Sequence, residues 1–127
     1  MTKRGVDYRN LEVWQRAHRL TISLYQVTRG FPDCERFCLV QQLRRAAVSI
    51  GSNIVEGRSR SSTAAYASYV DMALASGGEV SYQLLLSRDL GYLEDSVYEP
   101  LATEIGIIRN MLGALRNAVL RRKGGAS

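Results

Sequence analysis

Few residues of this sequence have the types and spacing that catalysis or metal binding requires. His18 is the single histidine, and the two cysteines, Cys34 and Cys38, stand four residues apart. A structural zinc site takes four ligands and a di-iron bundle needs two Glu-x-x-His motifs, so these residues indicate neither site. We expect both cysteines to be small apolar side chains, buried or half-buried, and we expect no metal and no cofactor.

Ser49 and Glu56 are the remaining candidates for acid, base or nucleophilic chemistry. A serine nucleophile needs a neighbouring base, and no sequence pattern links His18 to Ser49. The sequence also has no phosphate-binding P-loop, no dinucleotide-binding glycine run and no nucleophile elbow. We therefore expect no catalytic residues and no enzymatic activity.

The charge composition favours anion binding more than catalysis. The 127 residues include 17 basic and 12 acidic side chains, a net charge of +5, and 15 of the basic residues are arginine. Arginine presents a planar, always charged group whose donors fit phosphate or carboxylate oxygens. The basic balance permits a nucleic-acid partner without proving one.

Apolar side chains recur every three or four residues, and no useful stretch alternates with a period of two. This pattern predicts no strands, a loose tail at 124–127, and helices over about 11–28, 33–56, 63–90 and 97–122. Helices joined by such short loops run antiparallel to their neighbours. The chain is predicted to be one all-α domain over 1–127, an antiparallel up-and-down four-helix bundle.

Each predicted helix has an apolar face that we assign to the core. On the first helix it comprises Leu11, Trp14, His18, Ile22 and Tyr25. On the other three it comprises Leu39, Leu43, Ala47, Ile50 and Ile54, then Tyr66, Val70, Ala73, Gly77, Val80 and Leu84, and finally Tyr98, Leu101, Ile105, Ile108, Leu112, Leu115 and Val119. Gly77 and Gly78 predict close approach by a neighbouring helix, since glycine weakens a helix interior.

The expected location is the cytoplasm. Apolar residues make up 46% of the chain, but no apolar run reaches the ~18–20 residues that a membrane-spanning helix needs. The first eight residues lack the apolar stretch of a signal peptide.

The predicted topology sorts charge between the two ends of the bundle. The N-terminus, the second loop and the C-terminus lie together, and this basic end carries Lys3, Arg4, Arg9, Arg58, Arg60, Arg121, Arg122 and Lys123. Only Asp7 and Glu56 oppose them there. The first and third loops form an acidic end, with six acidic residues and three basic ones. Two interpretations stay open: a patch that binds a polyanion, and local compensation of helix dipoles.

A polar ridge runs along the second predicted helix beside its core face. It consists of Gln42, Arg45, Ser49, Ser52 and Glu56, with Arg44 and Asn53 on its flanks. Such a ridge can face solvent, a neighbouring subunit or a ligand. Helix packing with a few interhelical hydrogen bonds is the commonest explanation.

Several segments together resemble the four-helix bundle family encoded within intervening sequences of 23S ribosomal RNA genes. More distantly, they resemble the accessory protein of diversity-generating retroelements. The resemblance covers roughly residues 8–120. It rests on Leu11-Glu12-Val13-Trp14-Gln15, on Phe31-Pro32 with Glu35 and Leu39, on the run from Gln42 to Ile50, on Asn53-Ile54-Val55-Glu56-Gly57, and on Ser76 and Glu79.

This resemblance implies a ring-like homopentamer and suggests nucleic-acid binding, with no catalytic residues carried over. Gln42, Arg44, Arg45, Ser49, Asn53 and Glu56 are its motif residues, for contacts between helices or between subunits. The leading hypothesis is a non-enzymatic, oligomeric accessory protein that binds RNA or DNA through the basic end. The alternative is a protein–protein scaffold without nucleic-acid binding.

Overall fold

The computed structural model describes residues 7–126, and the side chains of residues 7–122. Within that part of the chain there are helices and no strands. In chain order the elements are η1 (Tyr8–Asn10), α1 (Glu12–Thr28), η2 (Asp33–Glu35), α2 (Leu39–Arg58), α3 (Thr63–Asp89) and α4 (Asp95–Ala126), where η denotes a short 3₁₀-helix. The all-α prediction is confirmed.

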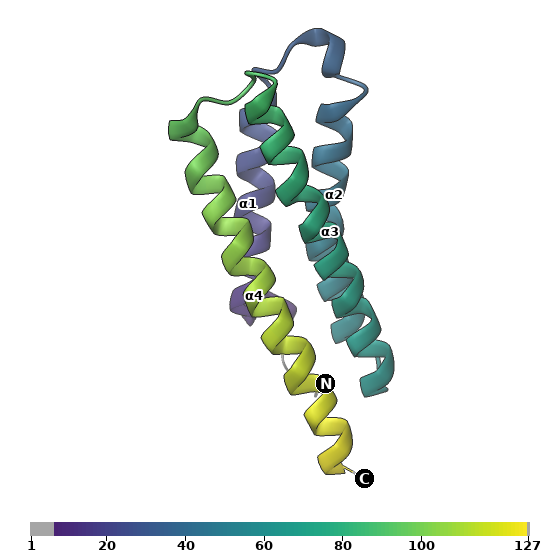
Figure 1. The fold of residues 1–127 in the computed structure, drawn as a ribbon. Helices are drawn as coiled ribbons and strands as arrows, with labels where there is room; N and C mark the ends of the chain where they lie inside the picture. Colours follow the sequence, from purple (N-terminus) through teal and green to yellow (C-terminus); the bar gives the residue numbers. More distant parts are fainter. Residues whose placement is uncertain (1–6, 127) are drawn as a thin grey trace.

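The four α-helices form an up-and-down bundle. Each helix packs against the next along the chain and α4 packs against α1, whereas α1 and α3 are diagonal, as are α2 and α4. The start of α1, the α2–α3 connection and the end of α4 lie toward one end of the bundle (Figure 1). The α1–α2 and α3–α4 connections lie at the other end.

The core faces predicted for α2, α3 and α4 are confirmed. Leu43, Ile54, Val70, Ile108 and Leu112 are each 0% exposed. Their spacing of three and four residues places them on the inner side of each helix, where burying each large aliphatic side chain stabilises the fold by about 1.5–3 kcal/mol.

The core face predicted for α1 is wrong. The buried residues are Val13, Ala17, Leu20, Leu24 and Thr28. The predicted face is turned outward: His18 is exposed, Trp14 is half-buried, and Ile22 and Tyr25 are 46% and 39% exposed. α1 carries two apolar stripes with the same helical period, and periodicity alone cannot tell which of them meets the other helices.

The prediction that a helix begins at residue 33 is also wrong. Only η2 forms there, and α2 begins at Leu39 because Cys38 has non-helical backbone angles, φ −120° and ψ −100°. Cys34 and Cys38 are exposed, contrary to their expected burial. They stand on the connecting turn between α1 and α2 instead of one helical face.

The turn that contains η2 is anchored to the α3–α4 connection. Phe31 is buried, and its ring lies 5.3 Å from that of Tyr92 between centroids. The Tyr92 hydroxyl donates a 2.8 Å hydrogen bond to Glu35 Oε2. The hydrogen bond to Glu35 raises the pKa of Tyr92, with smaller contributions from partial burial and the negative charge of the carboxylate, because all three disfavour the phenolate.

We expect Tyr92→Phe to flatten the loss of stability at alkaline pH. A raised pKa favours the neutral phenol in the folded protein, so this contribution is present below the unfolded pKa of about 10 and is lost at higher pH. Thermal melts between pH 8 and 11 should show the wild type losing stability more steeply than the variant. Parallel curves would contradict the role given to this hydrogen bond.

The predicted ends of the remaining helices are partly confirmed. Ser62 caps α3, with its hydroxyl accepting a 3.0 Å hydrogen bond from the Ala65 amide, and Gly91 ends it with φ +83°. α4 begins at Asp95, two residues before the predicted start, and continues to Ala126. A loose tail is therefore wrong for residues 124–126, since glycine weakens a helix without preventing it, and residue 127 lies outside the described residues.

Candidate nucleic-acid interface

Tyr66 is where three helices meet at the basic end. Arg58 Nη1, from the last residue of α2, donates a 3.4 Å hydrogen bond to the Tyr66 hydroxyl. The guanidinium carbon of Arg122, on α4, lies 5.9 Å from the centre of the Tyr66 ring. Tyr66 itself is 6% exposed. The structure thus brings together two arginines that are far apart in the sequence, as the predicted sorting of charge requires.

Close packing between α2 and α3 positions Arg58. A Cβ atom placed on the buried Gly57 would lie 2.9 Å from Tyr69 Cβ and 3.3 Å from the Tyr66 carbonyl oxygen. Only glycine allows the two helices this approach, because any other residue would clash with both tyrosines. α2 continues through Gly57 to Arg58, two residues beyond the predicted end at residue 56.

Two other basic residues predicted for this site are held in ion pairs. Arg60 Nη2 lies 2.7 Å from Glu56 Oε1, and its guanidinium covers the Tyr69 ring at 5.1 Å. Arg9 lies 2.7 Å from the Asp7 carboxylate, and its hydrogen bonds lower the pKa of Asp7. Their charge is partly neutralised before any ligand arrives.

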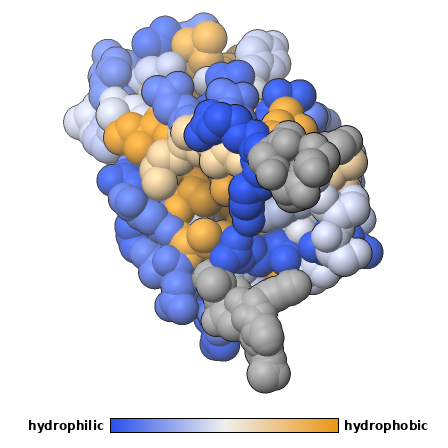
Figure 2. Space-filling model, turned by 90° about the horizontal axis from the view of Figure 1, so that it is seen from below, coloured by the Kyte–Doolittle hydropathy of each residue, from blue (hydrophilic) through white to orange (hydrophobic). Residues whose placement is uncertain are grey.

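Arg58, Arg121 and Arg122 form no ion pair with a carboxylate of residues 7–122. Lys3 and Arg4 lie outside the described residues, and so does the side chain of Lys123. Figure 2 shows this end of the molecule, where hydrophilic side chains surround an apolar area. Among the basic side chains of this end that the structure describes, Arg58, Arg121 and Arg122 are therefore the most available to an anion.

Two tyrosines, Tyr66 and Tyr69, belong to this site although the sequence alone did not identify them as site residues. Tyr66 and Tyr69 occupy the first two turns of α3, just after Arg58 and Arg60 in the sequence. Their spacing of three residues puts both rings on the side of α3 that meets the end of α2. The available signal was two arginines followed, within about three helical turns, by two tyrosines with this spacing.

The polar ridge mainly links helices within the chain. Ser49 Oγ lies 2.7 Å from Ser76 Oγ on α3, and Asn53 Nδ2 donates to Ser49 Oγ at 3.0 Å. Gln42 Oε1 accepts a 3.5 Å hydrogen bond from Gln83 on α3. These contacts fit the interhelical interpretation of the motif.

The charged motif residues do not take part in these contacts between α2 and α3. Arg44 faces α1, donating to Thr28 Oγ1 at 2.9 Å and to the Tyr25 carbonyl oxygen at 3.0 Å. Glu56 pairs with Arg60. Arg45 is exposed and forms no ion pair with the described carboxylates.

Gly77 and Gly78 accommodate a side chain of α4. A Cβ atom on Gly77 would lie 3.0 Å from Arg109 Cγ, and one on Gly78 would lie 3.6 Å from Arg109 Nη2. The expected close approach by a neighbouring helix is therefore made by the stem and guanidinium of Arg109, which cross α3 at the two glycines.

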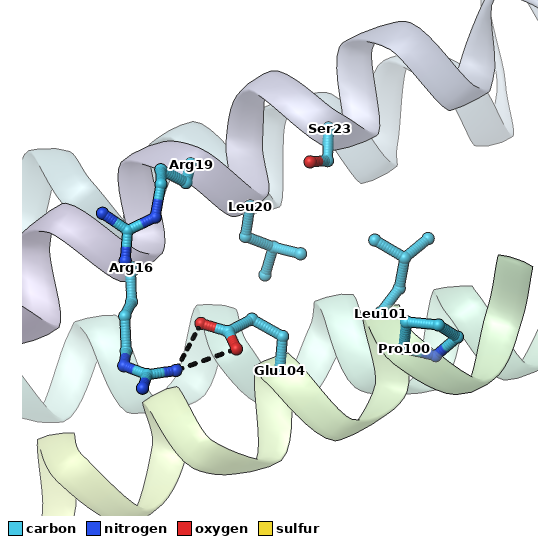
Figure 3. Close-up of a pocket in the computed structure, with 7 residues that line it drawn as sticks. All are labelled: Arg16, Arg19, Leu20, Ser23, Pro100, Leu101 and Glu104. Atoms are coloured by element: carbon cyan, nitrogen blue, oxygen red, sulfur yellow. Dashed lines mark hydrogen bonds and ion pairs between the residues drawn. The ribbon is translucent and has the colours of Figure 1, made fainter.

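A cavity of about 300 Å³ lies between α1 and α4 (Figure 3). Its lining residues are Arg16, Arg19, Leu20, Ser23, Pro100, Leu101 and Glu104. Arg16 Nη1 donates to both Glu104 oxygens, at 2.9 and 3.0 Å, and this pairing raises the pKa of Arg16. The pair joins α1 to α4.

Among the described residues, no three His, Cys, Asp or Glu side chains gather to hold a metal ion. No helix in that part of the chain is long and apolar enough to cross a membrane.

Comparison with known proteins gives one family match and similarity to a solved structure. The model of the family described as 23S rRNA-intervening sequence protein matches residues 9–114, a range that contains Arg58 and Tyr66 but ends before Arg121. A crystal structure of a protein of unknown function from the S23 ribosomal protein family of Bacteroides thetaiotaomicron has the same fold, with a TM-score of 0.77 and 22% identity. The similarity covers 83% of this chain and 95% of that chain. No curated protein matches the sequence. Since the family model matches well over half of its residues, this chain belongs to the 23S rRNA-intervening sequence protein family.

Proposed function

We propose that this protein is a non-enzymatic, oligomeric accessory protein of the cytoplasm that binds RNA or DNA through the basic end of its bundle. The observation that carries the proposal is the contact of both Arg58 and Arg122 with Tyr66. It joins two cations from separate helices around a single buried ring.

This arrangement suits phosphate better than bases. Tyr66 is 6% exposed, so its ring offers no free face on which a base could stack. The two guanidinium groups already contact Tyr66, which reduces the conformational entropy they would lose on binding phosphate oxygens. Binding should therefore go mainly to backbone phosphates, with little sequence preference and steep salt dependence.

Self-association would strengthen such binding. Subunits aligned in parallel would bring several copies of Arg58, Arg121 and Arg122 to one face, and linked sites bind a polyanion with higher avidity. The family resemblance leads us to expect five subunits. An oligomer with opposed subunits would divide these arginines between two faces.

The test replaces Arg58 and Arg122 together by glutamine. The matched control replaces Arg29 and Arg36, two exposed arginines of the acidic end that form no ion pair with the described carboxylates, so both variants lose the same charge. In filter binding with structured RNA and duplex DNA at ~50 mM salt, R58Q/R122Q should bind at least about tenfold more weakly, because one charge-assisted hydrogen bond contributes about 1.5–3 kcal/mol. Its salt slope should be shallower by about two.

Two results would overturn the proposal. One is that the wild type retains neither nucleic acid at low salt. The other is that the control variant loses as much affinity as R58Q/R122Q, which would make net charge sufficient. Recovery of an acidic protein partner after nuclease treatment, together with either result, would favour the scaffold alternative.

A further inference from the structure

The outer surface of the α1–α2 pair carries aromatic and aliphatic side chains, and the ring of Tyr8 covers its Trp14 end at 5.0 Å between centroids. We call the α1–α2 outer face the surface formed by Trp14, His18, Ile22, Tyr25 and Val48. The His18 ring stacks on Trp14 at 4.8 Å, with 9° between the ring planes. Ile22, Tyr25 and Val48 are 46%, 39% and 42% exposed.

These residues form one strip along the seam between the two helices. Thr21 Oγ1 donates to the Ala47 carbonyl oxygen, which puts the next residues, Ile22 and Val48, at the same level. A Cβ atom on Gly51 would lie 3.5 Å from Trp14 Nε1, so the indole lies against α2. Single exposed apolar residues are common, but a continuous strip of this kind marks a binding surface.

Charge indicates which kind of partner fits this face. Residues 13–28 and 39–55 contain no aspartate or glutamate. The one glutamate of each helix lies near a helix end and is paired with an arginine, Glu12 with Arg16 and Glu56 with Arg60. Nucleic acid fits poorly, because Arg44 is bound to Thr28 and Tyr25 and the middle of the strip is aliphatic. A partner with an apolar surface and an exposed carboxylate fits better.

The outer face of α3 has those two properties. Only four of its 27 residues are charged, whereas a surface helix normally carries a polar face. Met72 and Tyr82 on this face are 43% and 62% exposed, and Ala75 between them is exposed. Glu79 lies in the same stripe, is exposed, and forms no ion pair with the described cations.

We propose that the α1–α2 outer face binds the outer face of α3 on a second copy of this chain. Arg45, exposed on α2, would supply a cation for Glu79 of the second copy. The two faces differ and α1 is diagonal to α3, so each copy keeps one face free for the next. Such a heterologous contact closes into a ring when its rotation allows. The inference rests on the oligomer of the proposed function and names its contact surface.

Sedimentation velocity of the full chain tests the proposal through three variants, each checked for helicity by circular dichroism. The wild type should sediment as an oligomer, and I22E/V48E should be monomeric. Tyr82→Glu should also be monomeric, because it disrupts the other face. The matched control, Ile107→Glu, places the same charge on the outer surface of α4, where Ile107 is 37% exposed, and should sediment like the wild type.

Mixing the two monomeric variants separates this contact from a symmetric one. The I22E/V48E variant keeps its α3 face and Tyr82→Glu keeps its α1–α2 outer face, so an equimolar mixture should form a heterodimer. A wild-type monomer, an oligomeric I22E/V48E, or no heterodimer in the mixture would overturn the proposal.

The sole tryptophan, Trp14, gives a second readout on this face. Its emission should change as wild-type oligomer is diluted to monomer. Quenching by RNA in the wild type but not in Ile22→Glu would show that nucleic acid covers the face instead, and would also overturn the proposal. A wild-type monomer that binds RNA would defeat this inference and the oligomer of the proposed function but not its nucleic-acid binding, whereas an oligomer that binds no nucleic acid would defeat the nucleic-acid binding alone.

Discussion

Replacing Ile108 by alanine should lower the free energy of unfolding by about 2–5 kcal/mol, which is the range for truncating a fully buried large aliphatic side chain. Ile108 is 0% exposed in the core between α4 and the other helices. The loss combines the hydrophobic transfer of the removed atoms with the cavity they leave. This is the largest effect we expect from one substitution.

The adjacent residue supplies the control. Ile107 has the same side chain on the same turn of α4 but is 37% exposed, so Ile107→Ala should cost less than ~1 kcal/mol. Urea unfolding measures the loss of unfolding free energy in both variants. The protein concentration must be the same throughout, since self-association makes apparent stability depend on concentration. Equal losses for the two variants would mean that the inward face of α4 is not the one described.

The second large loss of stability is expected from adding one methyl group at Gly57. Gly57→Ala should destabilise the fold by about 1–3 kcal/mol, the usual range for overpacking a core. The new Cβ would lie 2.9 Å from Tyr69 Cβ and 3.3 Å from the Tyr66 carbonyl oxygen. One of these groups is backbone and the other is the rigid base of a side chain, so α2 and α3 must move apart.

Gly106 on α4 is the matched control for this substitution. A Cβ atom there would meet nothing within 4 Å, so Gly106→Ala should stabilise the protein by about 0.5–1 kcal/mol through helix propensity. Thermal melts of the two variants should shift in opposite directions. A stabilising Gly57→Ala would show that the α2–α3 contact adjusts without strain.

Gly57→Ala should also affect the proposed nucleic-acid interface. Tyr66 contacts both Arg58 and Arg122, so moving α3 away from α2 should separate the two cations and weaken nucleic-acid binding. Gly106→Ala should leave binding unchanged.

For α2, α3 and α4, sequence periodicity predicted which face of each helix is buried. In each helix the apolar stripe assigned from the sequence is the buried one, and it includes Ile54, Val70 and Leu112. The antiparallel order followed from short connections, and it correctly placed Arg58 and Arg122 at one end.

For α1 and for the turn before α2, sequence periodicity alone did not predict the structure. α1 has two stripes, and the one with Val13, Ala17 and Leu20 is buried. Cys34 and Cys38 keep a helical spacing on a segment that is not an α-helix. Which stripe is buried depends on the positions of α2 and α4, and those positions are not a property of α1.

The sequence by itself determined the helical class, the up-and-down order and the collection of arginine at one end, because all three follow from local periodicity and loop length. Only the tertiary structure decided that Tyr66 joins Arg58 to Arg122 and that the aromatic stripe of α1 faces outward. Those outcomes depend on how far each helix is rotated about its axis and on contacts between distant residues. Local sequence preferences specify neither.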